Sequence, residues 1–345
     1  MTWVPRRLPL AAAVPLAFFL NAALSVSARA HVKWFGSYSV SGAPRSLQSV
    51  LNHDLEFLVG ISILGLMAGC LVEWTAVGAA MLRALDRATA FVRDNTELMF
   101  RAGCAFFFVS IWAVGGILLT PELKTTSTAV GAIHFGIAAG MLSRRTMPLS
   151  ALGIAVIFVI AVWNYGMFHL ADYPVFLGVG AYLALTGLQR DLFGFRPVDV
   201  VRWSAGITLM WASIEKWAYP QWSFPLLTEH PNMTLGFDPD FFMRAAGAVE
   251  FALAFALVWT PLVRRLAAIL LAAMFISAVY EFGKIDLIGH SLIVVVLFAV
   301  IADSGAKTAL VRYPWLAPVG YTAALAGFLG IYYASHALLF GSTVI

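Results

Sequence analysis

Ten long apolar stretches follow one another along the chain, and short polar connections separate them. A helix needs about 20 apolar residues to cross a bilayer, and backbone groups in lipid must bond within their own segment. The pattern therefore predicts an all-α membrane protein with about ten transmembrane helices. The predicted spans are roughly 55–81, 98–119, 128–142, 149–168, 174–190, 203–219, 241–259, 266–282, 289–303 and 315–340.

The first thirty residues have the pattern of a secretory signal peptide. Residues 6–7 are arginines, residues 8–24 are mostly apolar, and residues 28–30 read Ala-Arg-Ala, which matches a cleavage site. We expect a signal peptide over 1–30, and its cleavage would make His31 the new N-terminus. The alternative is an uncleaved first helix.

The placement of Lys and Arg orients the spans. With the signal cleaved, the even-numbered connections hold thirteen of these residues and the opposite side holds six. Cytoplasmic connections are the richer ones in Lys and Arg. The sequence thus predicts a multi-pass protein of a bacterial-type inner membrane, with its mature N-terminus and its C-terminus extracytoplasmic. In this orientation all seven histidines lie on the extracytoplasmic side: His31, His53, His134, His169, His230, His290 and His336.

Two pairs of similar segments indicate an internal duplication. Residues 129–135 resemble 245–251, and residues 161–166 resemble 278–283, at offsets of 116 and 117 residues. Each predicted unit holds four spans, so the two units point the same way across the membrane as parallel repeats. The units are 98–200 and 201–305, with an extracytoplasmic N-terminus and first transmembrane helix in 31–97 and a C-terminal helix in 306–345. An insertion over roughly 218–240 has no helical run and is expected to form an extracytoplasmic cap or a re-entrant loop.

The second unit resembles the DoxX-like family of compact four-helix membrane proteins. The resemblance rests on Arg202, which opens the first helix, on Gly206, on the pair Glu215-Lys216, and on a Gly-x-x-Glu pattern. That last pattern is formed by Gly247 and Glu250. The family includes subunits linked to quinone-coupled thiosulfate oxidation, so the resemblance implies a four-helix fold and a role near quinone.

Several charged residues lie within or at the ends of predicted spans, where each costs about 2.5–3.5 kcal/mol on insertion scales. They are Glu215, Lys216, Glu250 and Glu281. The first unit departs from the family pattern, because it lacks an equivalent of Glu215-Lys216 and has His134 in place of Glu250. We predict that these five residues line a polar cavity that handles protons in periplasm-facing, quinone-linked redox chemistry. The alternatives are a buried ion-pair network that fixes helix packing and a scaffold protein without a small-molecule site. Whether the chain is an enzyme stays open.

A copper-handling membrane protein is a further alternative. A mature N-terminal His31 would offer its α-amine and its ring nitrogen to one ion, and His53 or His230 could add a second imidazole, a set that suits Cu(II). The simpler interpretation is that His31 only follows a cleavage site. Asn52 is expected to cap the helix that begins at His53, with Glu56 on the same helix face.

Other polar residues have local explanations. Asp286 and His290 are four residues apart and could pair on one helix. His169 and Asp172 are expected in an exposed turn, and Glu73 is expected to pair with a cytoplasmic arginine. The chain has two cysteines, Cys70 and Cys104, and no CxxC motif, so both are expected to pack between helices.

Overall fold

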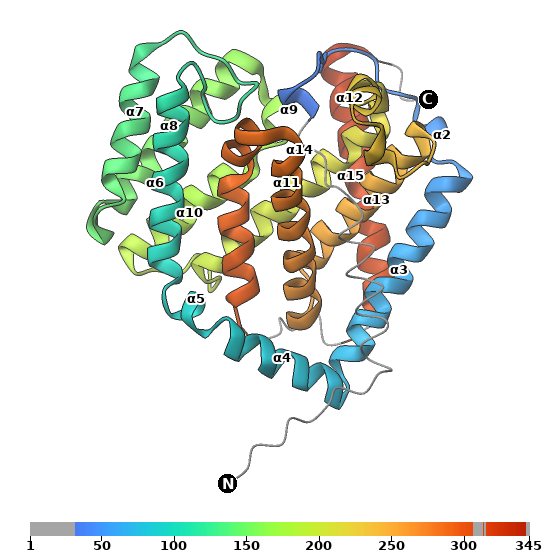
Figure 1. Cartoon of the computed structure of the whole chain (residues 1–345), viewed down its shortest axis with the longest axis horizontal. Helices are drawn as coiled ribbons and strands as arrows, with labels where there is room; N and C mark the ends of the chain where they lie inside the picture. Colours follow the sequence, from blue (N-terminus) through green and yellow to red (C-terminus); the bar gives the residue numbers. More distant parts are fainter. Residues whose placement is uncertain (1–31, 306–312, 314, 343–345) are drawn as a thin grey trace.

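The computed structural model describes residues 32–305, 313 and 315–342, and within these ranges it contains helices and no strand (Figure 1). The α-helices are α2 (Leu47–Val50), α3 (His53–Glu73), α4 (Ala76–Ala88), α5 (Ala90–Asp94), α6 (Thr96–Val114), α7 (Thr128–Gly140), α8 (Met147–Tyr165), α9 (Met167–Leu170), α10 (Pro174–Leu188), α11 (Pro197–Ala218), α12 (Phe224–Glu229), α13 (Pro239–Leu257), α14 (Pro261–Ala302) and α15 (Leu316–Phe340). Short 3-10 helices are η1 (Val32–Trp34), η2 (Arg144–Thr146), η3 (Pro220–Trp222) and η4 (Pro231–Thr234).

Helices lie where the apolar pattern predicted spans. In the described ranges, five helical segments are long and apolar enough to cross a membrane: α3, α6, the segment 144–165 that contains α8, α14 and α15. The apolar helices α7 and α10 are shorter, with 13 and 15 residues. At 1.5 Å per residue they are shorter than a ~30 Å hydrocarbon layer. The all-helical prediction is confirmed for the described residues.

The first predicted span, 55–81, is wrong beyond Glu73. Helix α3 ends at Glu73, and Thr75 starts α4 by accepting a hydrogen bond from the Gly78 backbone N–H at 3.2 Å. Helix α4 runs across one end of the helical bundle (Figure 1). Its arginines Arg83 and Arg87 are exposed. A helix with apolar and basic faces in this place is typical of one that lies in a membrane interface.

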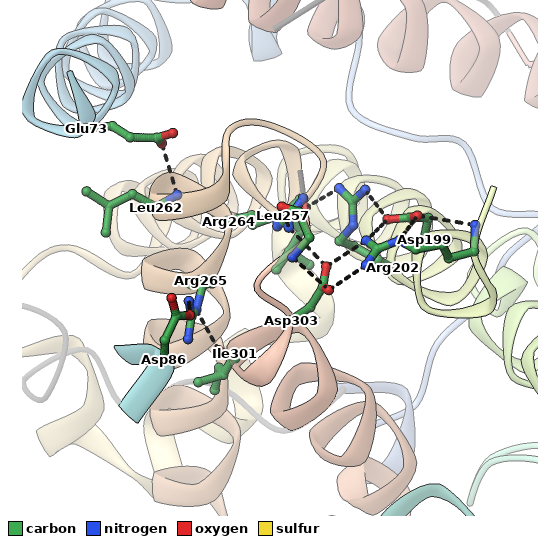
Figure 2. Close-up of polar contacts among 12 residues, drawn as sticks. Glu73, Asp86, Asp199, Arg202, Leu257, Leu262, Arg264, Arg265, Ile301 and Asp303 are labelled. Atoms are coloured by element: carbon green, nitrogen blue, oxygen red, sulfur yellow. Dashed lines mark hydrogen bonds and ion pairs between the residues drawn. The ribbon is translucent and has the colours of Figure 1, made fainter. Parts of the chain in front are cut away.

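Helix α14 is a helical hairpin. Gly283 interrupts it with φ 70° and ψ −150°, values that only glycine adopts readily. The two halves then lie side by side (Figure 1). One contact between them is the hydrogen bond that the Arg265 Nε donates to the Ile301 carbonyl at 2.7 Å (Figure 2). The predicted spans 266–282 and 289–303 are therefore these two halves.

Arginines close the C-terminal ends of two helices. Arg101, early in α6, donates from Nε to the carbonyl of Met141 at the end of α7, at 2.7 Å. Arg202, early in α11, donates from Nη1 to the carbonyl of Leu257 at the end of α13, at 2.9 Å. The last carbonyls of a helix have no partner within the helix, and a cation there also suits the helix dipole. The two contacts join equivalent helices of the two predicted units.

A second pair of arginine contacts follows the same pattern. Arg144, before α8, donates to the Thr186 carbonyl near the end of α10 at 3.2 Å. Arg265, at the start of α14, makes the contact with Ile301 described above. In each predicted unit, an arginine at the start of the third helix thus binds the end of the fourth.

Tryptophan–glycine packing also occurs twice. A β-carbon on Gly131 of α7 would lie 3.4 Å from Trp112 of α6, and one on Gly247 of α13 would lie 2.4 Å from Nε1 of Trp217 in α11. In both cases a tryptophan late in the first helix of a unit lies against a glycine of the second helix.

Ion pairs connect helices at the arginine-rich end of the bundle, which is the end where α4 lies. Asp303 accepts from Arg264 at 3.0 Å, and Arg202 donates to Asp199 at 3.0 Å (Figure 2). Glu73, for which an arginine partner was predicted, accepts a hydrogen bond from the Leu262 backbone N–H at 3.0 Å. This carboxylate therefore binds the positive N-terminal end of α14.

Candidate functional site around Lys33

Residues 32–46, called the N-terminal segment below, lie at the end of the bundle opposite α4 (Figure 1). The Lys33 side chain is fully buried, and its Nζ donates to Asp172 and to Glu215, the latter at 2.7 Å. The rings of Tyr38 and Trp222 have their centroids 5.8 and 5.6 Å from the same Nζ. We call these five residues the Lys33 cluster.

The partners of Lys33 come from segments far apart in the sequence. Asp172 lies in the turn between α9 and α10, and Glu215 lies in the last turn of α11. Burial alone would lower the pKa of Lys33, but Asp172 and Glu215 outweigh it and raise that pKa above its usual value. The lysine is therefore a stable ammonium ion.

The prediction that His169 and Asp172 lie in an exposed turn is wrong. They are 4% and 1% exposed, because the N-terminal segment covers them. The Tyr38 ring lies edge-on to His169 with centroids 5.5 Å apart. Burial lowers the pKa of His169 to about 3, so this imidazole is neutral at physiological pH.

A cavity borders the Lys33 cluster and measures about 70 Å³. It is several times larger than the ~10–15 Å³ that one water molecule requires. Lys216 and Glu250 line it and form an ion pair at 2.7 Å between α11 and α13. Asp172 and His290 also line it. The cavity thus holds both acidic and basic groups inside a bundle of apolar helices.

The predicted local pair of Asp286 and His290 is confirmed, with 3.1 Å between the carboxylate and Nδ1. Asp286 is fully buried and His290 is 8% exposed. Trp34, the residue after Lys33, lies over the His290 ring with centroids 4.5 Å apart. A β-carbon on Gly289 would lie 2.2 Å from the Trp34 ring, so glycine there lets the indole form one wall of the cavity.

A buried carboxyl lies beside this region in the connection between α6 and α7. Glu122 is 8% exposed and accepts a hydrogen bond from the Tyr173 hydroxyl. Burial raises the pKa of Glu122 above its usual value. Tyr173 itself lines the cavity. A carboxyl that holds its proton more tightly therefore lies next to the cavity wall.

The five predicted site residues do not all converge. Lys216 and Glu250 line the cavity, and Glu215 belongs to the Lys33 cluster. His134 is buried elsewhere, with its Nε2 2.8 Å from the Leu118 carbonyl. Glu281 pairs with His230 at 2.5 Å, and both side chains are partly exposed. Neither His134 nor Glu281 is among the residues that line the cavity.

Sequence reasoning missed Lys33 and the burial of Asp172. The sequence carried one signal, since Lys33 is followed directly by the large aromatic residues Trp34 and Phe35. Aromatic side chains of this size bury large apolar areas, so the two rings indicate that the segment packs against the rest of the protein. The sequence does not predict which acidic residues bind Lys33, because spacing along the chain predicts contacts only within one helix.

The residues proposed for copper are not assembled in the part of the chain that the structure describes. His31 lies outside the described residues. The His53 side chain is 95% exposed and lies 3.9 Å from Glu56, while His230 is paired with Glu281. Among residues 32–305, 313 and 315–342, no group of three or more His, Cys, Asp or Glu side chains is placed to hold a metal ion.

Comparison of the chain with protein-family models, with curated proteins and with solved structures finds no match.

Proposed function

We propose that the chain crosses a bacterial-type inner membrane ten times and contains two parallel DoxX-like repeats of four helices. The two sets of arginine contacts at helix ends, and the two tryptophan–glycine contacts, support the duplication. The excess of Lys and Arg at the α4 end supports a cytoplasmic location for that end. The cavity and the Lys33 cluster would then face the extracytoplasmic side.

For the activity, we propose that the chain supports quinone-linked redox chemistry by moving protons through the cavity. The observation that carries this proposal is the Lys216–Glu250 ion pair in a cavity of about 70 Å³. Reduction of a quinone to its quinol takes up two electrons and two protons. A redox partner would supply the electrons, and the cavity would supply protons from the extracytoplasmic side.

The size of the cavity limits what it holds. A cavity of about 150 Å³ accommodates benzene, and the present one is about half as large. Water molecules and protons fit inside it, whereas a quinone ring would bind at its opening. The residues of the chain therefore act on the proton: Glu250 accepts and releases it, and Lys216 stabilises the ionised carboxylate at 2.7 Å.

The test compares Glu250→Gln with Glu281→Gln in purified protein reconstituted in lipid nanodiscs. Both changes neutralise a carboxylate at the same end of the bundle, but only Glu250 lines the cavity. Binding of a short-chain ubiquinone analogue and the rate of proton uptake by the bound analogue on its chemical reduction are measured over an assay range of pH 5–9. We expect Glu250→Gln to slow this proton uptake strongly while its folded abundance stays unchanged, and we expect Glu281→Gln to behave as the wild type.

Two outcomes contradict this proposal. Absence of ubiquinone binding by the wild-type protein removes the quinone link. Loss of folded protein in Glu250→Gln, with Glu281→Gln intact, indicates that the ion pair serves helix packing. Co-purification of a stoichiometric soluble partner together with absent quinone binding would favour a scaffold.

A further inference from the structure

The Lys33 ammonium is held by groups that the chain brings together from three distant segments. Asp172 and Glu215 follow Lys33 by 139 and 182 residues. Their carboxyl groups are almost completely buried, with side chains 1% and 8% exposed. Two buried carboxylates need a cation between them, since an unpaired buried charge costs several kcal/mol.

Aromatic rings complete the surroundings of the ammonium. Tyr38 and Trp222 place their rings within 6 Å of Nζ, which is the range of cation–π attraction. Trp222 is fixed in turn by Tyr219, whose ring stacks on it with centroids 4.1 Å apart and an interplanar angle of 5°. The stacked pair keeps one face of Trp222 available for a cation.

We propose that Asp172, Glu215, Tyr38 and Trp222 form a binding site for a primary alkylammonium ion, which the chain fills with its own Lys33. The carboxylates take the N–H donors, and the rings attract the charge and cover the alkyl stem. Lys33 is thus a tethered ligand. A free primary amine of matching length binds the same groups when the lysine side chain is absent.

The cavity adjoins the site, because Asp172 lines the cavity as well as binding Lys33. Trp34 connects the two regions in another way. It follows Lys33 directly and forms a wall of the cavity. Occupancy of the site by Lys33 therefore holds Trp34 against His290 and keeps that side of the cavity closed. This inference does not depend on the proposed quinone chemistry.

Chemical rescue tests the proposal. Lys33→Ala removes Cγ, Cδ, Cε and Nζ, and n-propylammonium supplies a chain of the same atoms. Lys33→Met is the matched control, since it removes the charge and fills the space. The full-length variants are purified in detergent, and their thermal unfolding is measured with increasing n-propylammonium chloride, with sodium chloride and tetramethylammonium chloride at equal ionic strength as reference salts.

We expect Lys33→Ala to unfold at a lower temperature than the wild type, and n-propylammonium to raise that temperature in a saturable way. Tetramethylammonium lacks N–H donors and is expected to behave as sodium does. Lys33→Met is expected to show no specific response. If Lys33→Ala does not fold, Lys33→Ala combined with Glu215→Gln leaves one carboxylate to pair, and the same rescue is expected.

The proposal is overturned when n-propylammonium stabilises neither alanine variant beyond the effect of sodium chloride. It is also overturned when Lys33→Met responds as strongly as Lys33→Ala, because the amine would then bind elsewhere on the protein.

Discussion

Replacing Gly247 by alanine tests how α11 and α13 hold the Lys216–Glu250 pair. A β-carbon at Gly247 would lie 2.4 Å from Nε1 and 2.9 Å from Cε2 of Trp217, and 3.0 Å from the Ser213 carbonyl oxygen. Ordinary carbon contacts are about 3.5–4.0 Å, so the indole must move by roughly 1 Å or the helices must separate. Lys216 is the neighbour of Trp217, and the same movement lengthens its ion pair with Glu250.

The magnitude follows from three contributions. Overpacking of this kind costs about 1–3 kcal/mol. A displaced Trp217 also weakens its hydrogen bond to the Arg244 carbonyl, which spans 3.1 Å and is worth about 1 kcal/mol net. The higher helix propensity of alanine offsets this loss by up to ~1 kcal/mol. We therefore expect Gly247→Ala to lower the free energy of unfolding by about 1–3 kcal/mol.

The assay is thermal and denaturant unfolding of purified protein in one detergent. Gly136→Ala is the matched control, because Gly136 also lies inside a helix and a β-carbon there would meet nothing within 4 Å. It should be neutral or slightly stabilising. Equal stability of Gly247→Ala and Gly136→Ala would refute the account of close packing between α11 and α13.

Two other substitutions probe the end of the bundle opposite α4 and the helical hairpin α14. Burial raises the pKa of Asp240, but hydrogen bonds from Arg244 and Arg45 outweigh it and leave that pKa below its usual value. The stability that this carboxylate contributes is thus present above pH ~4 and is lost as the pH falls through the lowered pKa. Asp240→Asn should lower the free energy of unfolding by about 1 kcal/mol at pH 7. The same change should weaken the dependence of the free energy of unfolding on pH in the acid range. Gly283→Ala should destabilise the protein by about 1–3 kcal/mol, because residue 283 has a positive φ. Gly330→Ala in α15 should not, because a β-carbon there would meet nothing within 4 Å. The unfolding midpoints of the two variants test this difference.

Features confined to one helix were predicted correctly from the sequence. Asn52 accepts a hydrogen bond from the Leu55 backbone N–H at 3.1 Å and caps α3 as expected. Asp286 and His290 pair as their spacing indicates. Such contacts depend on helix geometry alone, which fixes the neighbours of each side chain over one turn.

The break after α3 shows where an apolar pattern misleads. The apolar stretch continues beyond Trp74, so hydropathy alone does not reveal that the chain changes direction. The local signal was Thr75, a residue type that favours helix starts. Likewise, the cap over 218–240 contains α12 and two 3-10 helices, although its many prolines and aromatics gave no helical period.

Contacts between helices were the part that the sequence did not determine. His134 and Glu250 occupy matching places in the two predicted units, yet each lies within its own group of helices. Parallel repeats are related by an axis along the membrane normal, so equivalent positions lie on either side of that axis and need not meet. The pairing of Glu250 with Lys216 instead follows from the packing of α11 on α13, which Gly247 permits.

The burial of Lys33 also sets an order of events during synthesis. Lys33 leaves the ribosome long before its acceptors, since Asp172 and Glu215 lie 139 and 182 residues later. At ~5–20 residues per second, Glu215 follows roughly 10–40 s after Lys33. Throughout that interval Lys33 lacks its second carboxylate partner, because Glu215 has not yet been synthesised. Docking of the segment that contains Lys33 is thus a late step of assembly, and a chain arrested before α11 would leave this segment undocked and within reach of proteases on its side of the membrane.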